Sequence, residues 1–227
     1  ERVGYDAWRR NSLVDHFYAG DARLEDVAAG RAEEQGDFCL GPFEAKLRRD
    51  DGRVQLQLVR QGRVGQRDVQ MTKGITLSDD GATLEIAYLL ENVPSDIGLH
   101  LAPEFNFAGL PAGADDRYFL DGRNARLGQL GEQLDLHDVD ALHLVDEWLG
   151  LQVGLRFNQP TKVWAYPVET VSQSEGGFEL VHQSVAVLPH WIVIPDADGR
   201  WSAAFELIID SSIAESRRGE LAEAAAT

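Results

Sequence analysis

From residue 36 onward, apolar side chains recur at every second position, which is the period of a β-strand with one buried face. In one such run, Val54, Leu56 and Leu58 alternate with polar residues. Acidic residues followed by glycine separate the runs and are typical of hairpin turns, as at residues 50–52, 78–81 and 196–199. Roughly ten or more such runs, with few helical patterns between them, predict an all-β fold of antiparallel strands.

The chain length favours a large sandwich of two sheets. It has 227 residues, whereas an immunoglobulin-type module needs only about 100. We expect three parts: residues 1–35 as a docking segment or linker, 36–210 as the sandwich, and 211–227 as a helical tail. In the first part, Trp8, Leu13, Val14 and Phe17 have near-helical spacing, which predicts short helices packed on the sandwich. The first residue is Glu1 rather than Met, which suggests a piece of a longer polypeptide.

Charge and cysteine content narrow the class of partner. The formal net charge is −17, which disfavours nucleic acid and anionic membranes as partners. It suits a neutral ligand such as a sugar, or simply a soluble surface. Cys39 is the one cysteine, so an internal disulfide and a cluster of thiolate ligands are excluded. Cys39 lies between Phe38 and Leu40, where a strand with a buried structural thiol is expected. The composition is typical of a cytoplasmic protein.

The run from Gly98 to Gly109 is the most informative stretch for function. It reads as a buried strand, yet it carries His100, Glu104 and Asn106 among apolar residues. Such groups are costly to bury unless something satisfies them. Because residues four apart on a strand share a face, His100 and Glu104 either form a bonded pair inside the sandwich or face a ligand.

Three stretches together resemble one enzyme family. They are residues 5–18 (YDAWRRNSLVDHFY), residues 101–109 (LAPEFNFAG) and residues 163–183, which include YPVETVSQSEGGFE. The chain is similar to the C-terminal β-sandwich of glycoside hydrolase family 57, the family of α-amylases and 4-α-glucanotransferases. The resemblance implies a galactose mutarotase-like β-supersandwich. It also implies that catalysis belongs to an N-terminal barrel outside this chain, so no catalytic residue is assigned here and no cofactor is expected.

The same fold relation implies an enzymatic alternative. Aldose mutarotases carry a general-acid histidine just before a Tyr-Phe-Asn-Leu string. The comparable string here starts at Glu104, and the histidine position falls near Ala102, two residues from His100. In this alternative His100 would be the acid, and Glu104 or Glu179 the base.

Aromatic and polar residues on predicted strands are candidates for carbohydrate binding, because sugar rings stack on aromatic faces and bond to nearby carboxylates and amides. Trp164 and Tyr166 are spaced two apart and share a face. Gln173 and Glu175 precede two glycines at a loop tip, which could meet a glucan or the barrel, or be a plain hairpin. The predicted carbohydrate-binding set is Trp164, Tyr166, His100, Glu104, Gln173 and Glu175. Each aromatic has the alternative of filling space between the sheets.

Metal and triad signatures are weak. The acidic loop pairs lack the spacing of a calcium loop, and His137 and His143 lack partners at zinc spacing, so no metal is predicted. Ser12, Asp15 and His16 are too close in sequence to form a catalytic triad. We expect Asp15 and His16 to bond to backbone in the docking segment.

Three hypotheses remain. The first is a non-catalytic domain that packs on the upstream catalytic barrel of the same polypeptide and contributes to α-glucan binding. The second is a free-standing mutarotase-like sugar epimerase. The third is an interaction module without a ligand.

Overall fold

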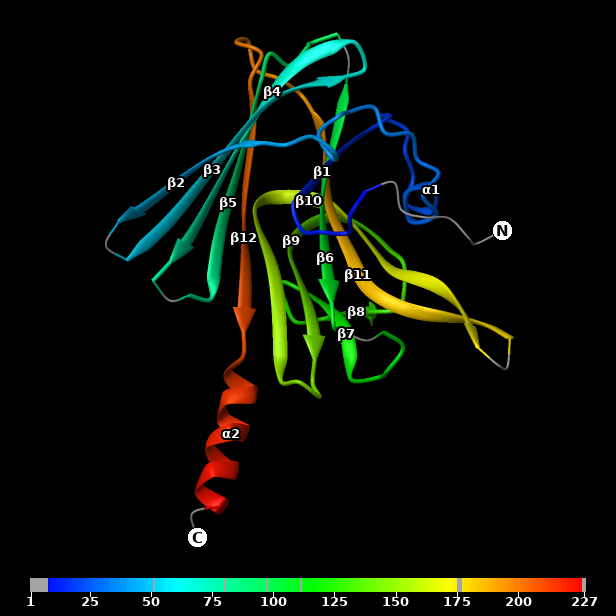
Figure 1. Cartoon of the computed structure of the whole chain (residues 1–227), viewed down its shortest axis with the longest axis vertical. Coiled ribbons are helices and arrows are strands. Elements are labelled where there is room, and N and C mark those ends of the chain that lie inside the picture. The colour runs from blue at the N-terminus through cyan, green and yellow to red at the C-terminus, as the bar shows by residue number, and fades with distance from the viewer. Residues whose placement is uncertain are drawn as a thin grey trace.

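The computed structural model is built almost entirely of antiparallel strands (Figure 1). It describes residues 8–50, 52–79, 81–96, 98–110, 112–174 and 177–225, and in these ranges the side chains of residues 78, 173, 174 and 220–225 are excluded. The elements are β1 (Val14–Tyr18), α1 (Leu24–Ala28), β2 (Glu44–Asp50), β3 (Arg53–Val64), β4 (Arg67–Ser78), β5 (Thr83–Glu91), β6 (Leu99–Ala108), β7 (Arg117–Asp121), β8 (Arg126–Gln129), β9 (Leu134–Asp146), β10 (Leu151–Ser174), β11 (Gly177–Val193), β12 (Trp201–Asp210) and α2 (Ser212–Ala225).

One hydrogen-bonded path joins most strands, in the order β1-β6-β11-β10-β12-β5-β4-β3-β2. Strand β9 pairs with both β10 and β7, and β8 pairs with β7. The long strand β10 serves both halves of the fold. Residues 152–157 pair with β12, whereas residues 162–174 pair with β11. The pairing of β10 with β9 shifts register between Arg156 and Thr161, close to where β10 changes partner.

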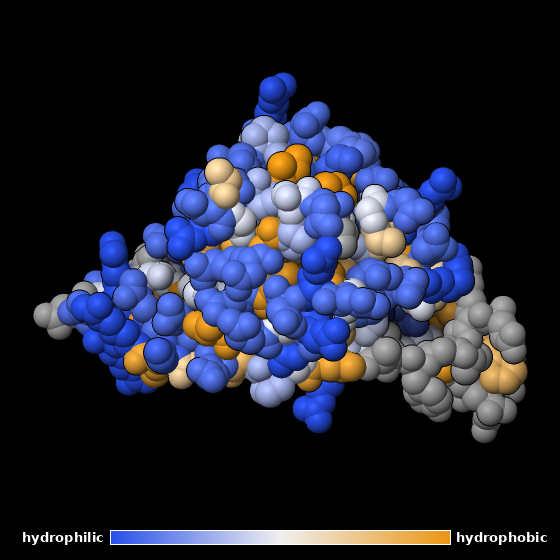
Figure 2. Space-filling model, turned by 90° about the horizontal axis from the view of Figure 1, so that it is seen from above, coloured by the Kyte–Doolittle hydropathy of each residue, from blue (hydrophilic) through white to orange (hydrophobic). Residues whose placement is uncertain are grey.

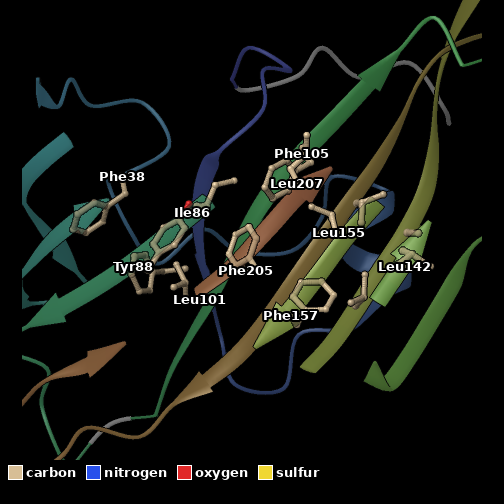
Figure 3. Close-up of a cluster of buried hydrophobic side chains, with 14 of the residues drawn as sticks. Phe38, Ile86, Tyr88, Leu101, Phe105, Leu142, Leu155, Phe157, Phe205 and Leu207 are labelled. Atoms are coloured by element: carbon tan, nitrogen blue, oxygen red, sulfur yellow. The ribbon is translucent and has the colours of Figure 1, made fainter. Parts of the chain in front are cut away.

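The main hydrophobic core includes side chains from β6, β10 and β12. Phe105 of β6 and Phe157 of β10 pack against Phe205 of β12, with ring centroids 5.8 and 5.9 Å apart (Figure 3). These three side chains are at most 7% exposed. Phe157 and Phe205 are cross-strand neighbours in the β10–β12 pair, whereas Phe105 comes from β6, which does not pair with β12. Burying a phenylalanine side chain stabilises a fold by about 1.5–3 kcal/mol, so this contact helps to hold β6 against β12.

The N-terminal segment differs from the expectation of short helices. Residues Val14–Tyr18 form strand β1, which pairs antiparallel with β6, and the only helix in the described part of this segment is α1. The prediction of a helix was wrong for these residues. The edge of β6 offers backbone hydrogen-bond partners to all five of them, whereas so short a segment has only a weak preference for a helix. Phe17 is consequently buried in the core, on the opposite face of β1 from His16.

A second correction concerns Cys39. The expected strand around this residue begins only at Glu44, and residues 38–40 form a turn in which Cys39 is half-buried. Asp37 accepts the Arg63 N–H at 3.0 Å, so the turn is fastened to the end of β3.

At the C-terminus, α2 extends away from the sheets (Figure 1). Its first turn contacts the loop between β9 and β10, where the Ala214 N–H donates to the Gly150 carbonyl at 3.3 Å. Among the described residues, the structure contains no helix with the length and apolar character of a membrane span. Figure 2 shows one face of the molecule, on which hydrophilic residues predominate and hydrophobic residues form small separate patches.

Candidate functional site

The polar residues of β6 lie on the face that points away from the main core. Strand alternation sends Leu101 and Phe105 inward, and sends His100, Ala102 and Glu104 outward. This outward face is itself covered, because His100 and Glu104 are 3% and 0% exposed. The register of β1 with β6 places His16 opposite Ala102, between those two residues.

Glu104 is held by several groups of its own chain. The Arg10 guanidinium donates to Glu104 Oε2 at 3.1 Å, and His16 Nε2 lies 3.5 Å from the same oxygen. The Asn106 amide donates to Glu104 Oε1 at 2.5 Å. Arg10 also donates to the Tyr166 hydroxyl at 3.3 Å, which links the segment before β1 to β10.

These contacts set the charge states. Burial acts to raise the pKa of Glu104, but the His16 hydrogen bond and the Arg10 charge outweigh it and hold this pKa below its usual value. Burial acts to lower the pKa of His16, yet hydrogen bonds to Glu104 and Glu34 raise it to about 9. At neutral pH the cluster therefore contains an imidazolium and an ionised Glu104.

His100 belongs to a different group of side chains. His100 Nε2 lies 2.9 Å from His190 Nδ1, and the His190 ring stacks on Trp164 with centroids 3.8 Å apart. Burial, the first cause, together with the neighbouring His100 and Lys162, lowers the pKa of His190 to about 2. Burial lowers the pKa of His100 as well. Both rings are therefore neutral at pH 7.

Asp15 faces the main core, on the other side of β1. Lys73 Nζ donates to Asp15 Oδ2 at 2.6 Å, and the Tyr88 hydroxyl donates to Oδ1 at 2.7 Å. The expectation that Asp15 and His16 bond to backbone was wrong, because both find charged side-chain partners: Asp15 bonds to Lys73, and His16 Nδ1 lies 2.7 Å from Glu34. A buried carboxylate is satisfied far better by an ammonium group than by amides alone.

The structure brings Trp164, Tyr166, His100 and Glu104 together on one face. Trp164 and Tyr166 are 3% and 1% exposed, and they form a small apolar cluster with Tyr18 and the α1 residue Leu24. A sugar ring reaches them only if the covering segment moves. Carbohydrate binding by these residues stays a prediction.

The remaining predicted residues lie elsewhere. Gln173 is near the end of β10, where its backbone pairs with Phe178, but its side chain and all of Glu175 are outside the described part. Glu179 is exposed on β11, thirteen residues before Ile192, which pairs with His100. At about 3.3 Å per residue, this separation is roughly 43 Å along the strand. The alternative base Glu179 therefore does not converge with His100.

Two concave regions lie near the loop between β9 and β10. One, of about 490 Å³, is lined by Asp116, Glu147, Trp148 and Arg217, and the Trp148 side chain is 74% exposed. A neighbouring concavity of about 340 Å³ also includes Tyr118. Neither is lined by the residues predicted to bind carbohydrate.

Sequence reasoning missed Arg10, Glu34, Lys73 and His190 as members of these clusters. The burial of Lys73 could have been predicted from the sequence. It is spaced two residues from Met71 and four from Val69, so all three side chains point to the same, buried face of one strand. The partners Arg10 and Glu34 lie in irregular segments, and nothing in a local pattern specifies which strand such segments cover.

Comparisons with known proteins agree with this architecture. Residues 1–205 match the family model described as alpha-amylase/4-alpha-glucanotransferase, C-terminal. The chain is 28% identical over 188 residues to an α-amylase of Pyrococcus furiosus, covering 83% of this chain and 24% of that protein. It is 26% identical over 184 residues to a 4-α-glucanotransferase of Thermococcus kodakarensis, covering 81% and 24%. The chain thus spans about a quarter of the length of the curated relatives it matches.

Solved structures show the same fold. The crystal structure of 4-α-glucanotransferase from Thermococcus litoralis matches with a TM-score of 0.67 at 22% identity, covering 92% of this chain and 29% of that one. A putative aldose 1-epimerase from Escherichia coli K12 matches with a TM-score of 0.50 at 14% identity, covering 88% and 80%. The prediction of an antiparallel, galactose mutarotase-like β-sandwich is confirmed. The chain belongs to the family of C-terminal domains of α-amylases and 4-α-glucanotransferases.

Proposed function

We propose that this β-sandwich is a non-catalytic domain that packs on the catalytic part of a longer enzyme acting on α-1,4-glucans. Two observations support the association with a longer enzyme. The chain matches a family of C-terminal domains, and its relatives are about four times as long as the matched region. In this role the domain stabilises the catalytic part and helps to orient substrate rather than breaking bonds.

The non-catalytic assignment depends on how Glu104 is bonded. A general acid or base must lie within hydrogen-bonding reach of the sugar. Glu104 instead is fully buried and engages Arg10 and His16 of its own chain. His100 engages His190 and the Ala19 carbonyl. The two groups that a mutarotase mechanism would require are thus bound to separate internal partners.

Turnover assays test this assignment. We expect the purified chain neither to cleave or transfer maltoheptaose nor to accelerate the interconversion of glucose anomers. Accelerated anomer interconversion that disappears in His100→Ala would instead establish the mutarotase alternative, provided the variant keeps the circular dichroism spectrum of the original chain. Maltoheptaose turnover would likewise contradict the proposal.

Glucan contact is the finer part of the proposal, and it is tested separately. Its support is the grouping of Trp164 and Tyr166 with polar side chains on one face. Maltoheptaose is titrated while tryptophan fluorescence is followed, in the original chain and in Trp164→Phe. A saturable change that Trp164→Phe removes supports glucan binding at this face. The absence of any saturable change up to tens of millimolar favours the interaction module without a ligand, because even weak sugar sites saturate in that range.

The same-chain partner and the location are tested in cells. We propose the cytoplasm, because the single cysteine and the acidic composition suit a reducing compartment. An antibody to this sandwich should detect one polypeptide several times longer than 227 residues in the cytoplasmic fraction. Detection of a 227-residue species alone would contradict the packing proposal.

A further inference from the structure

Three potential metal ligands from distant points of the sequence meet beside β1. A ring nitrogen of His16, a carboxylate oxygen of Glu34 and Cys39 Sγ all lie within 4.8 Å of one another. His16 belongs to β1, Glu34 forms an isolated bridge with Tyr18, and Cys39 lies in the turn at residues 38–40. The sequence spacing matches no zinc signature, which is why the sequence alone predicts no metal here.

The His16 ring is oriented as metal-binding histidines are. It is fully buried, and its Nε2 lies 3.5 Å from the Glu104 carboxylate while its Nδ1 lies 2.7 Å from Glu34 Oε2. Histidine ligands usually direct their second ring nitrogen at a carboxylate or carbonyl, which fixes the tautomer and the ring orientation. Glu104 fills that supporting position.

Glu34 is fixed with one oxygen toward the cluster. Its Oε1 accepts the Phe17 N–H at 2.8 Å and the Gly36 N–H at 3.1 Å. Its Oε2 lies 2.7 Å from His16 Nδ1. The backbone therefore holds one oxygen and leaves the other for a ligand-binding role.

Cys39, a half-buried residue, completes the set. The Glu34 carboxylate beside it supplies negative charge that a bound cation would neutralise. Asp37, two residues before Cys39, is paired with Arg60 at 3.2 Å.

We propose that His16, Glu34 and Cys39 bind a divalent cation of the zinc class, with water as the fourth ligand. Nitrogen, sulfur and carboxylate donors suit zinc, whereas calcium and magnesium require oxygen ligands. On binding, His16 Nδ1–H and Cys39 Sγ–H each lose a proton to solvent, and His16 keeps Nε2–H toward Glu104. One thiolate and one carboxylate then balance the two positive charges.

The His16 and Glu34 ligand atoms need only a small adjustment to accept the ion, and Cys39 Sγ lies within 4.8 Å of the ligand atoms of both residues. Two ligands at about 2.0 Å from zinc in a tetrahedral site are about 3.3 Å apart. His16 Nδ1 and Glu34 Oε2 are 2.7 Å apart, so they must separate by a few tenths of an ångström. The bound ion would join β1, the Glu34 bridge and the turn at residues 38–40, and so fasten the segment that covers β6.

Cobalt is the probe, because a cysteine ligand gives Co²⁺ a sulfur-to-metal charge-transfer band in the near ultraviolet. The untagged 227-residue chain is titrated with Co²⁺ and then with competing Zn²⁺, beside Cys39→Ser, Glu34→Gln and Glu33→Gln. Glu33 is the matched control, because it is the exposed sequence neighbour of Glu34 and is not among the three residues of the cluster.

We expect the original chain and Glu33→Gln to show a saturable band with one Co²⁺ per chain, displaced by Zn²⁺. Cys39→Ser should lose the band, and Glu34→Gln should bind at least tenfold more weakly. Zn²⁺ should raise the melting temperature of the original chain but not that of Cys39→Ser. Absence of the band, or equal affinity in Glu34→Gln and Glu33→Gln, overturns the proposed site. Since Cys39 is half-buried in a turn, circular dichroism of Cys39→Ser separates loss of binding from loss of fold.

Discussion

Lys73 Nζ lies 2.6 Å from Asp15 Oδ2, and the two side chains are 4% and 1% exposed. The pair connects β4 to β1, which lie far apart along the sheet path but face each other across the core. The Tyr88 hydroxyl and the Leu13 carbonyl complete the bonding of the two charges. The same lysine lies 4.3 Å from the centre of the Phe43 ring. Removing one partner of such a pair leaves the other buried and uncompensated.

Lys73→Met should therefore lower the free energy of unfolding by about 3–5 kcal/mol at pH 7. Urea denaturation measures this loss. The double variant Asp15→Asn/Lys73→Met should lose clearly less than the sum of the two single variants, because it leaves no unpaired charge. Strict additivity of the two single losses would contradict a coupled pair.

Glu104→Gln should destabilise the chain by about 3 kcal/mol or more, because it leaves Arg10 and the buried His16 without their shared carboxylate. The substitution keeps the side-chain shape, so packing is not altered. Glu85 is an exposed glutamate on β5, and Glu85→Gln should change stability by no more than about 0.5 kcal/mol. Similar denaturation midpoints for the two variants would argue against the charge cluster.

His190 predicts acid sensitivity. Its folded-state pKa is lowered from 6.5 to about 2 by burial and by the neighbouring His100, Lys162 and His137, while the unfolded chain has the ordinary value. Above pH 6.5 His190 is neutral in both the folded and the unfolded chain, so its contribution to stability does not change with pH. Between pH 6.5 and about 2 only the unfolded state binds the proton, so stability falls as pH falls, by up to about 1.4 kcal/mol per pH unit.

Replacing this ring isolates the effect. Urea denaturation at pH 7 and pH 5 should show a shallower loss of stability in His190→Asn than in the original chain, because the variant lacks the ring whose pKa folding lowers to about 2. The His100 pKa is also lowered, so part of the acid sensitivity should remain in the variant. Identical losses between the two pH values in both proteins would exclude His190 as the source.

Gly150 lies where α2 contacts the loop between β9 and β10, so a substitution there should weaken this contact. Its φ is +66°, and a Cβ added there would lie 2.8 Å from the Ala214 backbone nitrogen. Gly150→Ala should therefore combine a left-handed strain of about 1–2 kcal/mol with a clash that pushes α2 away. Gly65, with φ +58° and open space around its added Cβ, provides the matched strain-only control. Hydrogen exchange at the Ala214 N–H should accelerate in Gly150→Ala and stay unchanged in Gly65→Ala.

The alternation of apolar and polar residues was sufficient to predict which side chains share a face of a strand. It placed Trp164 and Tyr166 on a common face and gave β6 an apolar side and a polar side, as the structure has them. These features depend only on the alternation of side chains along one strand. The same pattern predicts two strands at residues 148–157 and 162–168, which the structure joins into the single long strand β10.

The partners of the buried charges could not be predicted in this way. Whether Arg10 reaches Glu104 depends on how residues 8–13 cross the sheet, which is a tertiary property. Likewise, β1 is only five residues long, and its strand conformation comes from pairing with β6 rather than from its own pattern. Cys39 looked like a strand residue because its neighbours are apolar, yet Phe38 turns into the core from a loop.

The two ends of the sheet path are treated differently. The β6 side is closed by β1, whereas the opposite end is β2, whose seven side chains are all exposed and include Glu44, Lys46, Arg48, Arg49 and Asp50. A row of mixed charges on an outermost strand discourages another molecule from adding its own strand there. Among the described residues no further strand pairs with β2 beyond β3, so these charges oppose edge-to-edge aggregation at that end of the path.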